Sequence, residues 1–94
     1  MSDGSTIVHD EGRQCFESVV DGRRCVCAYR LHGDTMVFTH TEVPPALQGR
    51  GIAAALVAAA LAHARERGLR VRPLCSYVAV YMRRHPETLD LLER

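Results

Sequence analysis

The sequence predicts a mixed α/β fold (an α+β mixed sheet), in which an antiparallel meander of strands precedes a parallel β-α-β crossover and a C-terminal helix. Two observations predict this order. The first half alternates polar and apolar residues between tight-turn dipeptides, as the strands of a half-buried sheet do. The second half begins at a proline pair and continues as a long alanine-rich stretch, which favours helix. Because 94 residues supply one hydrophobic core but not two, we expect a single domain over residues 1–94.

The strands of the first half are separated by residues that favour turns. Glu11-Gly12 follows a short apolar segment, and Asp21-Gly22 is a frequent tight-hairpin sequence because glycine accepts the positive φ of that turn. A third turn is expected at residues 32–34, and the segment after it is rich in β-branched residues. We therefore expect strands, in chain order, at residues 7–9, 14–20, 24–31 and 35–43.

Helical signals replace the strand pattern after Pro44-Pro45, since proline cannot donate a hydrogen bond to a sheet. Residues 48–67 carry apolar side chains at helical spacing, and Gly68 suits the position after a helix end. We therefore expect one long helix over residues 48–67.

The remainder of the chain predicts a short strand at residues 69–74, a helix at 76–84 with Ser76 as its N-cap, and a final helical turn at 88–92. A strand-helix-strand unit requires a right-handed parallel crossover. The strands on either side of the long helix should therefore lie side by side and parallel.

Composition and charge exclude several classes of protein. The formal net charge is +1, so little long-range attraction to nucleic acid is expected. The apolar run at residues 52–61 is about half of what a bilayer requires, and no secretory signal is visible, so we expect neither a membrane partner nor secretion but a cytoplasmic location. The four cysteines, at positions 15, 25, 27 and 75, form no CxxC pair, which argues against a metal site or a disulfide framework. We expect Cys15, Cys25 and Cys27 to be small core residues.

A glycine-rich segment lies between the third long strand and the long helix. Gly49 and Gly51 let a ligand approach the backbone, Ala53 and Ala54 keep the next turn small, and Arg50 adds a positive charge. The first turn of a helix has N–H groups without partners, so this segment suits a phosphate or pyrophosphate. It has neither the Walker ending nor the GxGxxG spacing, and a helix start without a ligand is an alternative interpretation.

The pattern Gln48-x-x-Gly51-x-Ala53 resembles the pyrophosphate-binding motif Q/R-x-x-G-x-G/A of the GNAT N-acetyltransferase superfamily. The wider likeness extends over residues 16–92 and is to the minimal, single-domain GNAT-like N-acetyltransferases. It is carried by residues 40–44, 49–52, 73–78 and 84–87.

This resemblance implies acetyl-CoA as the cofactor and an amine, such as a protein lysine or a small polyamine, as the acceptor. It implies that pantetheine lies where two parallel strands part. Two helices that usually wall the acceptor site have no counterpart here, so an open acceptor side is expected, in a monomer or weak homodimer. The expected cofactor-binding residues are Val43, Gln48, Gly49, Arg50, Gly51, Ile52, Ala53 and Ala54, with the basic pair Arg84 and His85 near the CoA phosphates.

Acetyl transfer to an amine requires a base, donors for the carbonyl oxygen and an acid for the leaving thiolate. His40 and Glu42 share one strand face, about 6.5 Å apart. Cys75 directly precedes a helix, where the helix dipole favours the thiolate. We expect His40 and Cys75 to face each other across the parted strands and Tyr81 to act as the acid, whereas Tyr77 packs on the core.

Several alternatives stay open at these residues. Cys75 could be acetylated as a nucleophile with His40 as its base, or His40 could assist direct transfer, which is the usual superfamily route. His40, Cys75 and Tyr81 could each be purely structural instead. The chain could also be a CoA-binding module with little or no transferase activity, or a redox sensor that uses Cys75.

Overall fold

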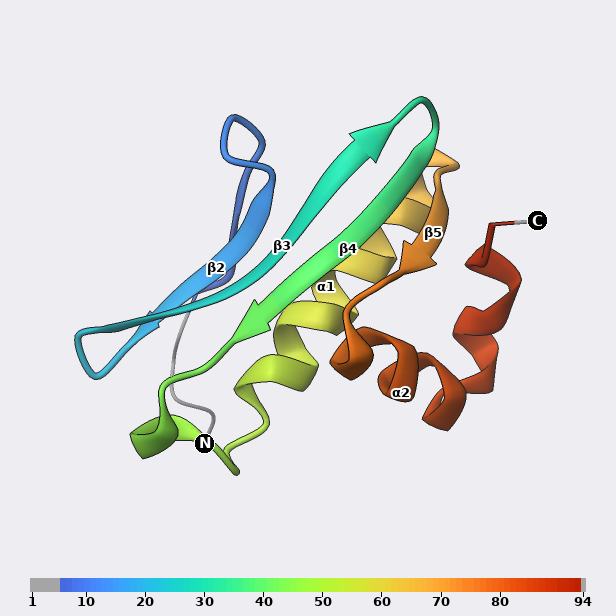
Figure 1. Cartoon of the computed structure of the whole chain (residues 1–94). Helices are drawn as coiled ribbons and strands as arrows, with labels where there is room; N and C mark the ends of the chain where they lie inside the picture. The colour runs from blue at the N-terminus through green and yellow to red at the C-terminus, as the bar shows by residue number, and fades with distance from the viewer. Residues whose placement is uncertain (1–5, 94) are drawn as a thin grey trace.

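The computed structural model describes residues 6–93, which form a five-stranded mixed sheet with the helices packed on one face (Figure 1). The strands are adjacent in chain order from β1 to β5. The elements are β1 (Val8–Asp10), β2 (Cys15–Val20), β3 (Arg23–His32), β4 (Thr35–Glu42), η1 (Pro45–Leu47), α1 (Ile52–Arg67), β5 (Arg70–Pro73), α2 (Ser76–Arg84) and η2 (Pro86–Leu91). The ends of the predicted domain, residues 1–5 and 94, lie outside the described residues.

The sheet has the predicted order of an antiparallel meander followed by a parallel crossover. β1 to β4 pair antiparallel, and β4 pairs parallel with β5 after the α1 crossover. Asp21 and Gly22, at the β2–β3 turn, have φ of 51° and 74°. Two successive positive φ values match the right-handed twist of a hairpin, so this turn forms as its sequence predicts.

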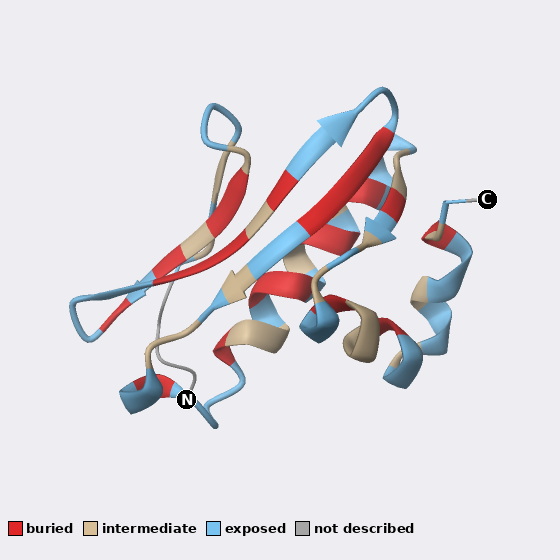
Figure 2. Cartoon of the chain, viewed as in Figure 1, coloured by how far each residue is buried: buried red, intermediate tan, exposed pale blue. Residues whose placement is uncertain are grey.

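One face of the sheet is covered by α1, α2 and η2, and the hydrophobic core lies between them (Figure 2). Phe16, Cys27 and Phe38 project from neighbouring strands onto Leu56 and Val78 of the helices, and all five are buried. The cysteines of β2 and β3 are buried small residues, as expected: Cys15, Cys25 and Cys27. No described helix covers the other face, on which strand alternation places charged residues such as Glu17 and Arg30 together with the buried Val26 and Val37.

A β-bulge changes the direction of the side chains in the second half of β4. Ala28 pairs with His40 and Tyr29 pairs with Phe38, so Thr39 is an extra residue on β4. Extra residues of this kind shift the alternation of side chains along a strand. His40 pairs with Ala28 on the uncovered face, whereas the next residue, Thr41, pairs with Cys27 on the helix-covered face.

The parallel pairing of β4 with β5 stops at Phe38 and Pro73. One further bond follows, in which the Cys75 backbone N–H donates to the Phe38 carbonyl at 2.9 Å. Beyond this point the end of β4 continues without β5 beside it. The strands therefore part where the sequence-based resemblance expects them to part.

The bounds of two helical segments and the N-cap of a third differ from the expected ones. α1 begins at Ile52 rather than residue 48, because the left-handed backbone at Gly49 and Gly51 cannot continue into a helix. Cys75, with extended backbone, is the N-cap of α2 in place of Ser76, which is already helical. The final turn is a 3-10 helix from Pro86 to Leu91, since proline suits a first helical position.

A cluster of aromatic rings ties β1 to the rest of the domain. The His9 ring stacks on Phe16 at 4.1 Å between centroids and meets His63 of α1 edge-on at 4.4 Å. His9 Nε2 and the Tyr29 hydroxyl are 2.5 Å apart. Burial lowers the pKa of His9 below its usual value, and the charge of His63 lowers it further. Arg67 acts in the same direction, against Glu11 and Asp10.

Acidification should therefore destabilise the fold through His9. The unfolded chain, with a His pKa of about 6.5, takes up this proton before the folded chain does. The stability contributed by neutral His9 is complete above the unfolded pKa of about 6.5. It is lost as the pH falls through the lower pKa that His9 has in the folded protein. His9→Phe, which keeps a stacked ring, should show a smaller loss of melting temperature between pH 7.5 and pH 5. An equal loss in both proteins, measured by circular dichroism, would contradict this assignment.

Candidate functional site

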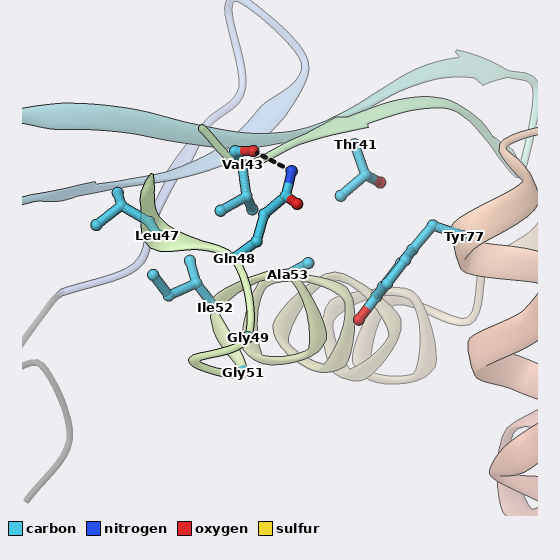
Figure 3. A pocket seen from close by; sticks show the side chains of 9 residues that line it. All are labelled: Thr41, Val43, Leu47, Gln48, Gly49, Gly51, Ile52, Ala53 and Tyr77. Atoms are coloured by element: carbon cyan, nitrogen blue, oxygen red, sulfur yellow. Dashed lines mark hydrogen bonds between the residues drawn. The ribbon is translucent and has the colours of Figure 1, made fainter. Parts of the chain in front are cut away.

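A cavity of about 490 Å³ lies between the end of β4, the glycine loop, the start of α1 and the start of α2 (Figure 3). Its volume is in the range of small-molecule sites in proteins. The cavity opens where β4 and β5 part, and it includes most of the glycine segment. Its lining residues are Thr41, Val43, Leu47, Gln48, Gly49, Gly51, Ile52, Ala53 and Tyr77.

The start of α1 presents backbone N–H groups to this cavity. Gly49 and Gly51 have φ of 86° and 80°, a region that side chains with a Cβ rarely adopt. A Cβ at either glycine would have nothing within 4 Å, so the space in front of the loop is open. Ala55 is the first residue of α1 whose N–H bonds to the preceding turn, at 3.0 Å from the Gly51 carbonyl. No side chain caps this end, and the first turn has no acidic residue.

Gln48 and Arg50 hold the loop from two sides. Gln48 Nε2 donates to the Val43 carbonyl at 3.0 Å, which ties the loop to the end of β4 (Figure 3). The Arg50 guanidinium lies 3.2 Å from the carboxylate of Asp21, on the β2–β3 turn. Arg50 is absent from the cavity lining, so in this structure its charge fixes the loop to the hairpin.

Cys75 contacts Thr41 at the opening between the strands. The Cys75 thiol donates to Thr41 Oγ1 at 3.5 Å, and the Thr41 hydroxyl donates to the Cys27 sulfur at 3.8 Å. Burial raises the pKa of Cys27 to about 11, so that thiol stays protonated at neutral pH. Cys75 is only partly buried, which makes it the reactive candidate of the pair.

His40 lies on the opposite face of β4 from Cys75, so the expected pairing of these two side chains is wrong. The bulge at Thr39 turns Thr41 towards the cavity and His40 towards the uncovered face. His40 Nε2 is 3.1 Å from Glu42 Oε1, and both side chains are more than half exposed. Because a carboxylate only accepts, Nε2 carries the proton of neutral His40 and Nδ1 is its acceptor.

Tyr77 rather than Tyr81 lines the large cavity, and its ring crosses from α2 towards the start of α1 (Figure 3). It is 41% exposed, so the expectation that it packs on the core is wrong. Tyr81 stacks on His85 at 3.9 Å, and burial raises the pKa of its phenol. Tyr77 and Tyr81 both border a smaller cavity of about 180 Å³, together with Ala54, Val80, Arg84 and His85.

Sequence reasoning missed Thr41 altogether. Its position two residues before Val43 on a strand that ends at the glycine loop was a usable signal, because the two side chains share a face. Within residues 6–93, no group of three or more His, Cys, Asp or Glu is arranged to hold a metal ion. Across the same span, no helix has the length and apolar character to cross a membrane.

Residues 15–91 match the sequence profile of the GCN5-related N-acetyl-transferase family. The chain therefore belongs to this family, and its parted strands and glycine loop agree with that assignment. It is 37% identical over 83 residues to Protein NATD1 of Mus musculus, covering 85% of this chain and 76% of the relative. Protein NATD1 of Danio rerio is 33% identical over 89 residues, covering 89% and 81%.

The fold is also that of a solved relative. The solution NMR structure of a GCN5-like protein from Staphylococcus aureus superposes with a TM-score of 0.75 at 24% sequence identity. The match covers 94% of this chain and 87% of that chain. At this identity the likeness concerns the fold.

The burial of the cysteines predicts selective labelling. Iodoacetamide should add one group to the native protein, at Cys75, whereas all four cysteines should react in denaturant. Intact-mass and peptide mass spectrometry would measure both results. Cys75→Ser is the control and should give no native adduct, and rapid native labelling of Cys27 would contradict the structure.

Proposed function

We propose that this chain binds acetyl-CoA in the large cavity and transfers the acetyl group to an amine acceptor. The observation that carries the proposal is the uncapped start of α1, which opens through Gly49 and Gly51 onto the cavity. Family membership supports the cofactor, since GCN5-related N-acetyltransferases generally use acetyl-CoA.

The residues of the loop fit the pyrophosphate of such a cofactor. The N–H groups of the first turn have no helical partner, and the helix dipole favours an anion there. The space in front of Gly49 and Gly51 is open, and no acidic residue of the first turn opposes a negative charge. Gly49, Gly51, Ile52, Ala53 and Ala54 are therefore the proposed phosphate-binding residues, with Gln48 and Arg50 holding the loop in shape.

The rest of the cavity fits the pantetheine arm. Thr41 and Val43 line it from the end of β4, and Tyr77 closes it from α2. Because β5 no longer pairs with this part of β4, backbone groups of β4 are available to a strand-like ligand. When bound, acetyl-CoA would supply the acetyl thioester that an amine attacks.

His40 is the proposed base for the acceptor amine. It lies on the uncovered face of β4, so an acceptor approaching from that face would not compete with the cofactor for space. Glu42 holds Nε2, which leaves His40 Nδ1 as the acceptor of the ammonium proton. The hydroxyl of Thr41 and the thiol of Cys75 lie at the opening between the strands and could return a proton to the leaving sulfur.

Direct transfer is favoured over a covalent route through Cys75. A cysteine nucleophile needs a base within hydrogen-bond reach, and the Cys75 thiol is hydrogen bonded to a threonine, which is no base at neutral pH. His40 projects from the other face of β4. The expected role of Tyr81 as the acid is not proposed further, because Tyr81 does not border the large cavity.

A CoA-binding module without transferase activity is the second candidate. It is supported by the exposure of His40 and Glu42, since no described helix walls the acceptor side. Slow hydrolysis of acetyl-CoA as the only reaction in a broad amine screen would favour it over the transferase.

Ala53→Glu should abolish cofactor binding. The new carboxylate would occupy the space proposed for the pyrophosphate, and like charges in close contact cost several kcal/mol, so affinity should fall at least about a hundredfold. A glutamate near a helix N-terminus is favourable for the helix itself, so the fold should persist. Isothermal titration with acetyl-CoA measures the effect.

Ala62→Glu, at an exposed position later in α1, is the matched control and should leave the affinity within about twofold of the wild type. Absence of binding heat with wild-type protein would refute the proposed cofactor. Equal weakening by both substitutions would refute the proposed location.

His40→Gln should lower kcat at least about a hundredfold, which is the lower limit of the usual contribution of a general base. Acetyl-CoA affinity should not change, because His40 lies on the face away from the cavity. Glu42→Gln should have a smaller effect on kcat. Steady-state kinetics with the best acceptor from an amine screen measures these changes.

The same assay separates the two chemical routes. Wild-type turnover with no acetylated Cys75 in the intact mass spectrum is expected, and Cys75→Ser should keep measurable activity. An acetyl-Cys75 species that forms and decays at the rate of turnover would overturn direct transfer. Unchanged kcat in His40→Gln would remove His40 as the base.

A further inference from the structure

We propose that Arg30 of β3 binds an anionic group of the acceptor, so that the preferred acceptor is an amine joined through a short aliphatic chain to a carboxylate. This inference rests on the proposed function, because it takes His40 as the place where the amine loses its proton. It names the class of amine, which the proposed function leaves open.

Arg30 and His40 lie on the same face of the sheet, on neighbouring strands. His40 pairs with Ala28, and Arg30 follows two residues after Ala28 along β3. The extra residue of the bulge lies on β4, so the alternation along β3 is unbroken and Ala28 and Arg30 share the uncovered face. Two residues of a strand span about 7 Å. The guanidinium and the imidazole are therefore within the reach of one small molecule.

The surface between these two side chains is small and apolar. Ala28 separates them on β3, and Val37, which pairs with Arg30, is only 5% exposed although no described helix covers this face. Neighbouring side chains must therefore cover Val37, and the long ones that flank it on the adjacent strands are Arg30 and Arg72. An arginine stem can lie along apolar surface while its guanidinium stays in water. An aliphatic chain on this surface would contact Ala28 and the stem of Arg30.

The guanidinium of Arg30 is available to a ligand. Carboxylates of the same face are held by other arginines, since Arg24 lies 2.7 Å from Glu17 and Arg72 lies 2.6 Å from Glu93. No hydrogen bond or ion pair holds Arg30 to another residue within the described range 6–93, and its side chain is exposed. A guanidinium binds a carboxylate through two parallel hydrogen bonds. Arg30 therefore offers this face an anion-binding group.

Opposite charges on the two sides of His40 give the acceptor a direction. Glu42 pairs with Val26, two residues before Ala28, whereas Arg30 lies two residues after it. An ammonium group is attracted towards Glu42, and a carboxylate is attracted towards Arg30. An acceptor with both charges would therefore lie along the strands with its amine at His40. A polyamine, which is positive at both ends, would be repelled by Arg30.

Steady-state acetylation of ε-aminocaproate and of hexylamine tests the proposal. The two amines have the same chain and differ only in whether it ends in a carboxylate or a methyl group. In wild-type protein, kcat/KM should be about fivefold higher for ε-aminocaproate, the upper range for one exposed ion pair, and the difference should lie in KM. Arg30→Gln should bring the two values within about twofold by raising KM for ε-aminocaproate alone, and Arg30→Lys should give an intermediate ratio.

Arg23→Gln is the matched control. Arg23 is an exposed arginine at the start of the same strand, and alternation places its side chain on the other face, so the ratio should not change. Isothermal titration should give the same acetyl-CoA affinity for all variants, because Arg30 lies on the face away from the cavity. Thermal unfolding identifies any loss of fold, and Arg30→Lys, which keeps the charge and the long stem, supplies the ratio if Arg30→Gln does not fold.

The outcomes separate this inference from the proposed function. Equal kcat/KM for the two amines in wild-type protein, or a preference that persists in Arg30→Gln, would overturn the role of Arg30 and leave the transferase intact. Acetylation of other amines but not of ε-aminocaproate would do the same. Binding of acetyl-CoA without acetylation of any amine in a broad screen would overturn the proposed transferase and this inference together.

Discussion

The candidate site exists because the hydrogen bonding between β4 and β5 stops before β4 itself ends. After Phe38 and Pro73, the two strands share only the bond from the Cys75 N–H to the Phe38 carbonyl. This leaves one side of β4 without a neighbouring strand. Unpaired backbone N–H and C=O groups of the strand cost free energy unless water or a ligand binds them. The cavity, the glycine loop and the start of α2 are all arranged around that unpaired segment.

The bulge at Thr39 acts together with this opening. Without the extra residue, Phe38 and His40 would share a face, and the imidazole would point to the helices. With it, an apolar residue, a small hydroxyl and a second apolar residue follow one another on the covered face: Phe38, Thr41 and Val43. The histidine and the glutamate are sent to the other face, so the two faces of one strand acquire different chemistry.

Local signals predicted the elements that depend on nearby residues. The hairpin at Asp21-Gly22 and the bounds of α2 each follow from turn and helix preferences within a few residues. The glycine loop was expected to be the first turn of the long helix, and its left-handed backbone was not predicted. The bulge could not be predicted, because it is defined by the register of β4 on β3, some ten residues away. The ion pair that draws Arg50 to the hairpin likewise depends on two segments that meet only in the fold.

The glycine loop has one further consequence, for protein engineering. At Gly49 and Gly51 the left-handed backbone is essential, but the space in front of it is open. Loop shape and loop access are therefore separate properties. Asparagine tolerates the left-handed region better than other residues with a side chain, so it could preserve the bend while narrowing the entrance. Substitution at these positions could therefore change access to the cavity while the bend of the loop stays the same.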